Sequence, residues 1–548
     1  MGHCSSYWLR YVYALFIPLM DYDSAHHAGI ALHMYLTNNY AFLVDNGKPY
    51  LDKPHLLFWL AALSYKIFGV TSFAYKFPSF LFSLLAIYST YRLCKQLYNK
   101  PTGVLAAIIL ATAFAFTVSV NDVRMEGLLT GSVIFSVWQL YDYVKRRKAI
   151  NLIFAALGMA AGFSTKGMIG VAIPVIALLL HLLYTKQWRM IFHPAWIILV
   201  ILFALFISPV VYAYYLQFDL HPETVVREQN NISGVKFILW NQNLQRMKGE
   251  SHGANQSDFF FFFHTFIWAF LPWSLLCILA VAARGKELFK TKFHANGLPE
   301  IISIGTSVFF IIIFSFSRFK LPHYLNCLFP FFSILLAGYL VKKRADIKKQ
   351  KQFWILQVIV VSLMLVLGLI LSGWTFPFNH VWKAAAAFCL LAIVIAVFFY
   401  KTSLFNKQIL LTVSGFVFLL GTLTINFYPQ LLTWQAGNQL AFKAVEQKIE
   451  PSGIYYFIDN FHSPSFDFYS GWLHSHITAK QINDSITAGK SLWIYTNKEG
   501  YDTLRQNGNR FGRVYSNKDY RVSVLKGSFI NPKTRDKAVT TTYLIELL

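Results

Sequence analysis

Three short charged stretches in the first quarter of the chain contain residue types that could carry out group transfer. "MDYDSAHHA" holds the carboxylate Asp23, and "KPYLDKPHLLF" places Asp52 beside Lys53. "NDVRMEGLL" adds Asp122 and Glu126. A carboxylate can deprotonate an acceptor hydroxyl, and a lysine can stabilise the charge that develops on a departing phosphate. Together these residues predict a site at which a phosphate leaves and a hydroxyl attacks.

Each of these residues also has a purely structural interpretation. Asp23 and Asp122 could cap the helices that follow them, and Lys53 could anchor the chain at a membrane surface. Lys166, in "GFSTKGMIG", could contact phosphate or stabilise the C-terminus of its helix. Convergence favours the site, because the acidic loops and the basic loop 317–324 are expected on one face of the membrane.

The elements that must position these residues are membrane-spanning helices. Of the 548 residues, 56% are hydrophobic and only 14% are charged, whereas soluble proteins carry about 25% charged residues. Apolar runs long enough to cross a bilayer recur as far as about residue 428. We therefore expect a polytopic α-helical membrane protein with about 13 transmembrane helices, near 7–20, 73–97, 103–119, 127–144, 150–164, 168–184, 192–214, 260–283, 300–316, 322–340, 353–373, 381–400 and 409–428.

The placement of positive charge predicts the orientation of these helices. Six short loops contain 21 Lys or Arg residues, and the loops that alternate with them hold far fewer. This bias predicts that the basic loops are cytoplasmic, and it explains the net charge of +24 without nucleic acid as a partner. The transmembrane domain, 1–430, then has two long outer loops, 21–72 and 215–259, on the face that carries the charged stretches. The first loop is expected to contain helices over 24–37 and 55–68.

The remaining residues, 431–548, are predicted to form a small extracytoplasmic α/β domain. Apolar and β-branched runs indicate strands, and amphipathic runs indicate helices. The chain contains no P-loop and no Rossmann glycine fingerprint, so we expect no nucleotide cofactor. Its five Cys residues form no CxxC pair. The expected strands lie in 453–459, 490–497, 519–527 and 541–548, and the expected helices in 434–449 and 498–507.

The charged stretches also resemble, in order, the motifs of a known family. The first outer loop, "DSAHHAGIALHMYLTNNYAFLVDNGKPYLDKPHLLFWLAAL", is similar to that of bacterial lipid A aminoarabinose transferases and related protein O-mannosyltransferase-like enzymes of the GT-C fold. "VRMEGLLT", "GFSTKGMIG", "WNQNLQRMKG" and "KLPHYLNCLFP" resemble the motifs that follow in that family. The resemblance covers about residues 10–340.

The resemblance implies an integral-membrane glycosyltransferase and assigns roles to individual residues of this chain. Asp23 falls on the position of the catalytic base and Glu126 on the second acidic position, while Lys53 falls on the lysine that contacts the carrier phosphate. This chain departs from the family pattern at the residues that follow Asp23, so we expect that no cofactor is required. Whether a divalent metal binds at Asp52 is left open. The other positions expected to bind the donor phosphate are Arg246, Lys320, Tyr324 and Lys166, and those expected to line the cavity are Asp52, Asp122 and His26.

The implied reaction moves a sugar, with inversion, from a polyprenyl-phosphate donor to a lipid A-like or other cell-envelope acceptor. The enzyme would lie in the bacterial inner membrane, among membrane lipids, with its site and C-terminal domain facing the periplasm. A protein O-glycosyltransferase or a glycan ligase of the same fold is an alternative. A secondary transporter is another, but it should have ionisable residues in mid-span and paired broken helices. We expect His323 to be structural.

Overall fold

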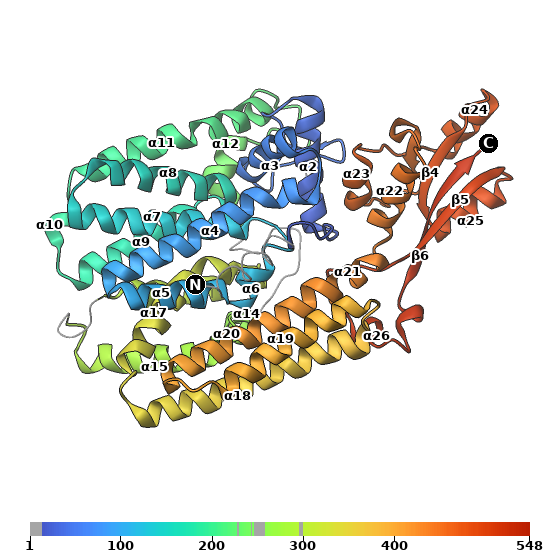
Figure 1. Ribbon diagram of the computed structural model, residues 1–548. Coiled ribbons are helices and arrows are strands. Elements are labelled where there is room, and N and C mark those ends of the chain that lie inside the picture. The colour runs from blue at the N-terminus through green and yellow to red at the C-terminus, as the bar shows by residue number, and fades with distance from the viewer. Residues whose placement is uncertain (1–13, 227–228, 243, 246–257, 295–299) are drawn as a thin grey trace.

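The computed structural model describes residues 14–226, 229–242, 244–245, 258–294 and 300–548. Long helices pack side by side in a bundle, and a smaller domain built on a sheet lies beyond one end of it (Figure 1). The chain enters the smaller domain through α21 (Tyr428–Leu431). The domain boundary near residue 430 stays a prediction.

The helices of the bundle follow the predicted apolar runs in order. By length and composition, six described helical segments could cross a membrane, and four shorter apolar helices accompany them; the count of about 13 spans stays a prediction. The uninterrupted helices of this part of the chain, short connecting helices included, are α4 (Ser72–Leu97), α5 (Lys100–Ala111), α7 (Glu126–Arg146), α8 (Ala149–Lys166), α9 (Ile169–Tyr184), α10 (Trp188–Ile191), α11 (Ala195–Tyr214), α12 (Gly234–Lys236), α16 (Ile302–Phe316), α17 (Phe329–Lys342), α18 (Ile347–Leu369), α19 (Val381–Phe399) and α20 (Leu404–Thr422).

Two predicted spans are interrupted, and their breaks face each other. The run 103–119 divides into α5 and α6 (Phe114–Val118), and the run 260–283 divides into α14 (Phe261–Ala269) and α15 (Ser274–Lys290). Pro272 lies in the second break and has no N–H with which to continue a helix. Phe114 N donates to Leu271 O at 2.9 Å. One break thus satisfies a backbone donor at the other, and backbone groups inside a membrane need such partners.

The first outer loop forms the two predicted helices with a short hairpin between them. These are α2 (Asp23–Thr37), β1 (Val44–Asp45), β2 (Lys48–Pro49) and α3 (Leu56–Phe68). Small side chains on α2, among them Ala28 and Ala31, are fully buried and allow α3 to approach closely. The hydroxyl of Tyr65 on α3 donates to the carbonyl of Ala28 at 3.3 Å. This packing places the start of α2, with Asp23, near the Asp52–Lys53 turn that precedes α3.

The C-terminal domain contains a four-stranded sheet in the order β3-β4-β6-β5. Strands β3 and β4 are parallel, while β6 is antiparallel to both β4 and β5. The two predicted helices are present. The elements are α22 (Ala436–Glu446), β3 (Ile454–Tyr456), α23 (Pro464–Ser470), α24 (Ala479–Thr487), β4 (Leu492–Asn497), α25 (Lys498–Gln506), β5 (Phe511–Asp519), α26 (Gly527–Ile530) and β6 (Thr540–Leu547).

The strand predicted over 519–527 is wrong, because the fourth strand is β5, immediately before it. β5 is an edge strand with mostly exposed side chains, so it lacks the apolar signal on which the prediction depended. The apolar residues further along serve another contact. Val522 and Phe529 pack against Phe376 and neighbouring residues of the bundle. This segment therefore joins the two domains instead of extending the sheet.

Candidate active site

The charged stretches meet around a cavity of about 270 Å³. The first outer loop, the segment leading into α7, the end of α8 and the loop 317–324 all contribute side chains. The structure thus brings Asp23, Lys53 and Glu126 to one cavity, as the sequence predicts for them. The lining residues are Asp23, His26, His27, Tyr50, Asp52, Lys53, Arg124, Met125, Glu126, Lys166, Phe319, Leu321 and His323.

Arg124 organises one side of this cavity. Its Nη1 lies 2.7 Å from Asp23 Oδ2, and its Nη2 lies 3.0 Å from Asp122 Oδ2. Its Nη1 also lies 3.4 Å from His323 Nδ1. The rigid fork of the guanidinium suits it to hold two carboxylates in a fixed relation. About half of the Asp23 side-chain surface, 52%, stays exposed, so this carboxylate is held in place and still faces the cavity.

The two aspartates that share Arg124 differ in their surroundings. Asp23 lies in the first turn of α2, and it does not cap that helix through its side chain. Burial raises the pKa of Asp122, and the neighbouring Arg124 opposes this shift. Asp122 lies behind Arg124 and outside the cavity lining. We infer that Asp122 supports Arg124, while Asp23 is the carboxylate that faces a substrate.

Glu126 and Lys166 form a buried ion pair in the wall of the cavity. Lys166 Nζ lies 2.7 Å from Glu126 Oε1, and the two side chains are only 5% and 4% exposed. His323 Nε2 lies 3.4 Å from the same carboxylate oxygen. The Lys166 ammonium also lies 4.3 Å from the centre of the Tyr324 ring. Both carboxylates are paired with a cation, but Glu126 is almost fully buried while Asp23 is half exposed, so Glu126 is a poorer candidate base than Asp23.

The Lys53 side of the cavity is tied to both outer loops. Gln242 Nε2, from the second outer loop, donates to the backbone carbonyl of Asp52 at 2.6 Å. His27 is buried, and its burial, together with the charges of His26, Lys53 and Arg124, holds its pKa well below the ordinary value. The positive charge that contributes to this shift also suits the cavity to an anion.

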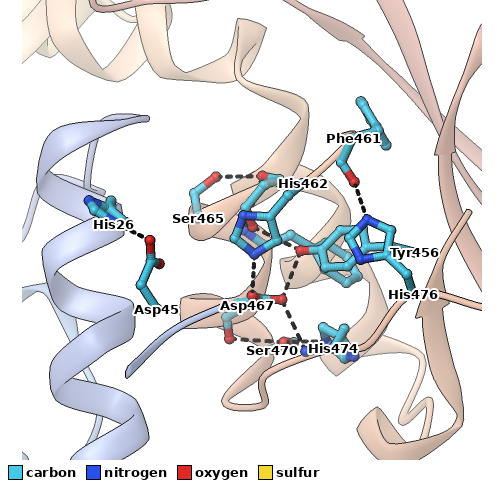
Figure 2. A network of polar contacts seen from close by, with 12 residues as sticks. His26, Asp45, Tyr456, Phe461, His462, Ser465, Asp467, Ser470, His474 and His476 are labelled. Carbon is cyan, nitrogen blue, oxygen red and sulfur yellow. Dashed lines mark hydrogen bonds and ion pairs between the residues drawn. The ribbon is translucent and has the colours of Figure 1, made fainter. Parts of the chain in front are cut away.

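His26 connects the cavity to the C-terminal domain. Its Nε2 lies 2.8 Å from Asp45 Oδ2 on the hairpin of the first outer loop. Figure 2 shows this pair facing a second pair, His462 and Asp467, across the boundary between the domains. In that second pair His462 Nε2 lies 2.7 Å from Asp467 Oδ2.

Two of the predicted donor-binding residues, Lys320 and Tyr324, are not among the residues that line the cavity. Lys320 donates to the backbone carbonyl of Asp258 at 2.6 Å. The backbone there is not helical before Pro322, so Phe319 and Leu321 face the cavity and Lys320 points away. Tyr324 lies behind Lys166, and Arg246 falls outside the described residues. The cavity positions expected of Lys320, Tyr324 and Asp122 are thereby corrected, and the phosphate-binding role of Lys320 and Tyr324 stays a prediction.

Sequence analysis did not single out Arg124 and assigned His323 a structural role. A signal for Arg124 was present, since it lies two residues from both Asp122 and Glu126 in the "VRMEGLLT" motif. His323 gave no comparable signal, because its partners come from a segment about 200 residues earlier. Among the residues that the structure describes, no group of three or more His, Cys, Asp or Glu could hold a metal ion. A metal at Asp52 stays a prediction.

Comparison with known proteins agrees with this architecture. Residues 52–213 match the family described as dolichyl-phosphate-mannose-protein mannosyltransferase. The undecaprenyl phosphate-α-4-amino-4-deoxy-L-arabinose arabinosyl transferase of Wigglesworthia glossinidia brevipalpis is 26% identical over 457 residues, covering 78% of this chain and 75% of that protein. Its namesake from Edwardsiella ictaluri is 25% identical, and the match covers 64% of this chain and 61% of that protein.

A solved structure supports the fold along almost the whole chain. The crystal structure of ArnT from Cupriavidus metallidurans bound to undecaprenyl phosphate superposes with a TM-score of 0.70 at 16% identity, covering 98% of this chain and 97% of that one. The chain shares the fold of that structure, and the matched family and the named relatives indicate a glycosyltransferase. Within that class the chain is similar to the aminoarabinose transferases, which confirms the resemblance seen in its motifs.

Proposed function

We propose that this protein transfers a sugar from a polyprenyl-phosphate donor to an acceptor at the extracytoplasmic face of the bacterial inner membrane. The observation that carries the proposal is the cavity in which Asp23 faces Lys53 and Arg124. A carboxylate and two cations at the ends of apolar helices suit a lipid phosphate that enters from the bilayer. The relatives named as undecaprenyl-phosphate-sugar transferases support the donor class.

The cavity accommodates the head of such a donor more readily than a whole lipid. Its volume of about 270 Å³ lies near the lower end of small-molecule sites, which run from about 300 to 1,000 Å³. A sugar phosphate can occupy it while the polyprenyl chain stays among the membrane lipids. No nucleotide is needed, because the phosphate on the carrier is already the leaving group.

The chemistry follows from where the charges lie. An acceptor hydroxyl attacks the anomeric carbon of the donor, and the bond from that carbon to the phosphate oxygen breaks. The polyprenyl phosphate departs with the bonding electron pair, and Lys53 with Arg124 stabilises its negative charge. The hydroxyl proton passes to the Asp23 carboxylate. Attack opposite the leaving group inverts the anomeric centre.

Two acceptor classes fit the proposal. A lipid A-like or other cell-envelope lipid follows from the similarity to aminoarabinose transferases. A protein acceptor, in a protein O-glycosyltransferase, follows from the family matched over 52–213. Secondary transport fits less well, because the described acids of the cavity lie at helix ends on one face of the bundle. Mass spectrometry of envelope lipids and glycans from cells with and without the gene separates the two acceptor classes.

A transfer assay with purified protein tests the proposal. The full-length chain in lipid nanodiscs is given a radiolabelled undecaprenyl-phosphate sugar and an envelope lipid extract, with and without EDTA. We expect wild-type transfer in both conditions, since no metal is proposed to act, and at least a 100-fold loss in Lys53→Ala. Lys66→Ala is the matched control, because Lys66 is an exposed lysine of the same outer loop that contacts Tyr40 outside the cavity.

The outcomes are distinct. Full activity of a folded Lys53→Ala protein contradicts the phosphate role of Lys53. Loss of wild-type transfer with EDTA, restored by a divalent metal, contradicts the metal-free mechanism and directs attention to Asp52. The absence of any transfer by the wild type, with uptake of a solute into proteoliposomes, favours the transporter.

A further inference from the structure

The C-terminal domain is hydrogen-bonded to residues 19–21, the backbone segment that precedes Asp23. The side chain of Asp21, two residues before it, accepts three hydrogen bonds from that domain. Asp21 Oδ1 accepts from Ser465 N at 3.0 Å, and Oδ2 accepts from Ser465 Oγ at 2.7 Å and from Ser463 Oγ at 3.3 Å. These serines begin α23, so a carboxylate of the membrane domain satisfies donors at the first turn of a helix more than 440 residues away in the chain.

The backbone on either side of Asp21 is bonded as well. The amide of Asp21 donates to Gln435 Oε1 at 3.0 Å, and Gln435 Nε2 donates to the carbonyl of Leu19 at 3.0 Å. The amide of Leu19 donates to the hydroxyl of Tyr469 at 2.7 Å, and that hydroxyl also bonds Ser72. Gln435 and Leu19 are almost fully buried, at 1% and 0% exposure. Residues 19–21 are therefore held by side chains from the C-terminal domain and its entry segment, and water does not compete for these bonds.

A second contact between the C-terminal domain and the first outer loop lies next to Asp23. The hydroxyl of Tyr22 donates to the carbonyl of His462 at 3.3 Å. Beside it the His26–Asp45 pair faces the His462–Asp467 pair across the domain boundary, as Figure 2 shows, and these four residues line one small shared cavity. The C-terminal domain therefore bonds Tyr22, next to Asp23, and lies beside His26, which also lines the large cavity.

We propose that Asp21 is a positioning residue, through which the C-terminal domain sets the location of the Asp23 carboxylate relative to the donor. The proposal rests on the proposed function. Asp23 is the first residue of α2 and is half exposed, so the segment before it decides where the helix begins. Two residues span only about 7 Å of chain, and a displacement at Asp21 reaches Asp23 with little attenuation. A misplacement of about 1 Å can lower the rate about 100-fold.

The test compares Asp21→Ala, Asp21→Asn, Ser465→Ala and Asp21→Ala/Ser465→Ala in the nanodisc transfer assay. We expect Asp21→Ala to lower kcat about 10- to 100-fold while the KM for the donor changes less than threefold, because Lys53 is held by other contacts. Asp21→Asn keeps one acceptor oxygen and should recover part of kcat. The double variant should be no slower than Asp21→Ala alone. Asp484→Asn, an exposed carboxylate of α24 in the same domain, should match the wild type.

Amide hydrogen exchange gives a second readout that needs no activity. Peptides covering 14–37 should exchange faster in Asp21→Ala and in Ser465→Ala than in Asp484→Asn. A wild-type kcat in Asp21→Ala, additive losses in the double variant, or unchanged exchange over 14–37 overturns the proposal. If Asp21→Ala does not fold, Asp21→Asn and Ser465→Ala decide by the same criteria. If the wild type transfers no sugar, the proposed function fails, and the exchange data still decide whether the C-terminal domain holds this segment.

Discussion

Substituting either residue of the buried Glu126–Lys166 pair should lower the stability of the fold. The two losses should differ, because Glu126 and Lys166 have different neighbours. Removing one charge leaves the other in a site where each side chain is 5% exposed or less. We expect Glu126→Gln to be the more damaging change, because the Lys166 ammonium then keeps the Tyr324 ring but has lost its carboxylate. Lys166→Met should be milder, since Glu126 retains His323 Nε2 at 3.4 Å.

The size of the effect can be worked from the geometry. At 2.7 Å Coulomb's law gives roughly 6 kcal/mol of attraction at an effective dielectric constant of about 20. The cost of burying both charges offsets most of that attraction, so the pair as a whole adds little net stability. Breaking it from one side is different, and costs about 3–5 kcal/mol because an uncompensated charge stays buried. We expect a loss near the top of that range for Glu126→Gln and near the bottom for Lys166→Met.

A double-mutant cycle measures this directly. The wild type, both single variants and Glu126→Gln/Lys166→Met are unfolded with increasing SDS in mixed micelles, and the transition is followed by tryptophan fluorescence. The double variant should recover most of the stability that Glu126→Gln loses. With single losses of about 5 and about 3 kcal/mol and a double loss of about 2 kcal/mol, the coupling energy is roughly 6 kcal/mol. Lys342→Met serves as a control, because its contact with Glu287 is at an exposed position on the bundle.

Additive losses in the cycle, or a loss below about 1 kcal/mol in Glu126→Gln, would refute the buried pair. The same variants also address the role of Glu126 in transfer. If Glu126 acted as the base, the double variant would regain stability but no activity. If the pair is structural, activity should return together with stability.

Two further predictions concern Arg124 and the domain boundary. Arg124→Gln should lower kcat about 100-fold and Arg124→Lys should restore little of it, because an ammonium cannot bridge Asp23 and Asp122 as the guanidinium fork does; a wild-type kcat in Arg124→Lys contradicts this. Burial raises the pKa of Asp21 to about 6, against the opposing hydrogen bonds of Ser465, so the folded carboxyl keeps its proton to a higher pH than the unfolded one. Its contribution to stability is therefore greatest below pH 4 and is lost as the pH rises to 6. SDS unfolding at pH 4, 5, 6 and 7 should show a flatter dependence for Asp21→Asn than for Asp484→Asn, and identical curves would contradict the shift.

Local sequence patterns were sufficient for much of the helical architecture. The boundaries of α2, α3 and most bundle helices follow apolar runs and helix-start residues, because a segment in lipid must satisfy its own backbone. The breaks after Ala111 and at Pro272 were less evident, since a hydrogen bond between distant segments, from Phe114 N to Leu271 O, joins them. β5 was missed because an exposed edge strand has no apolar alternation.

The sequence by itself determined which residues could do chemistry, and it placed them on the same side of the bundle. Residue type decides what a side chain can donate, accept or hold, and charge placement predicts the topology of the loops. Only the tertiary structure decided how they pair: Lys166 with Glu126, Arg124 with Asp23, and Asp21 with Ser465. These partners are 40, about 100 and 444 residues apart in the chain, and local patterns carry no information over such separations. Packing alone brings them within hydrogen-bonding distance.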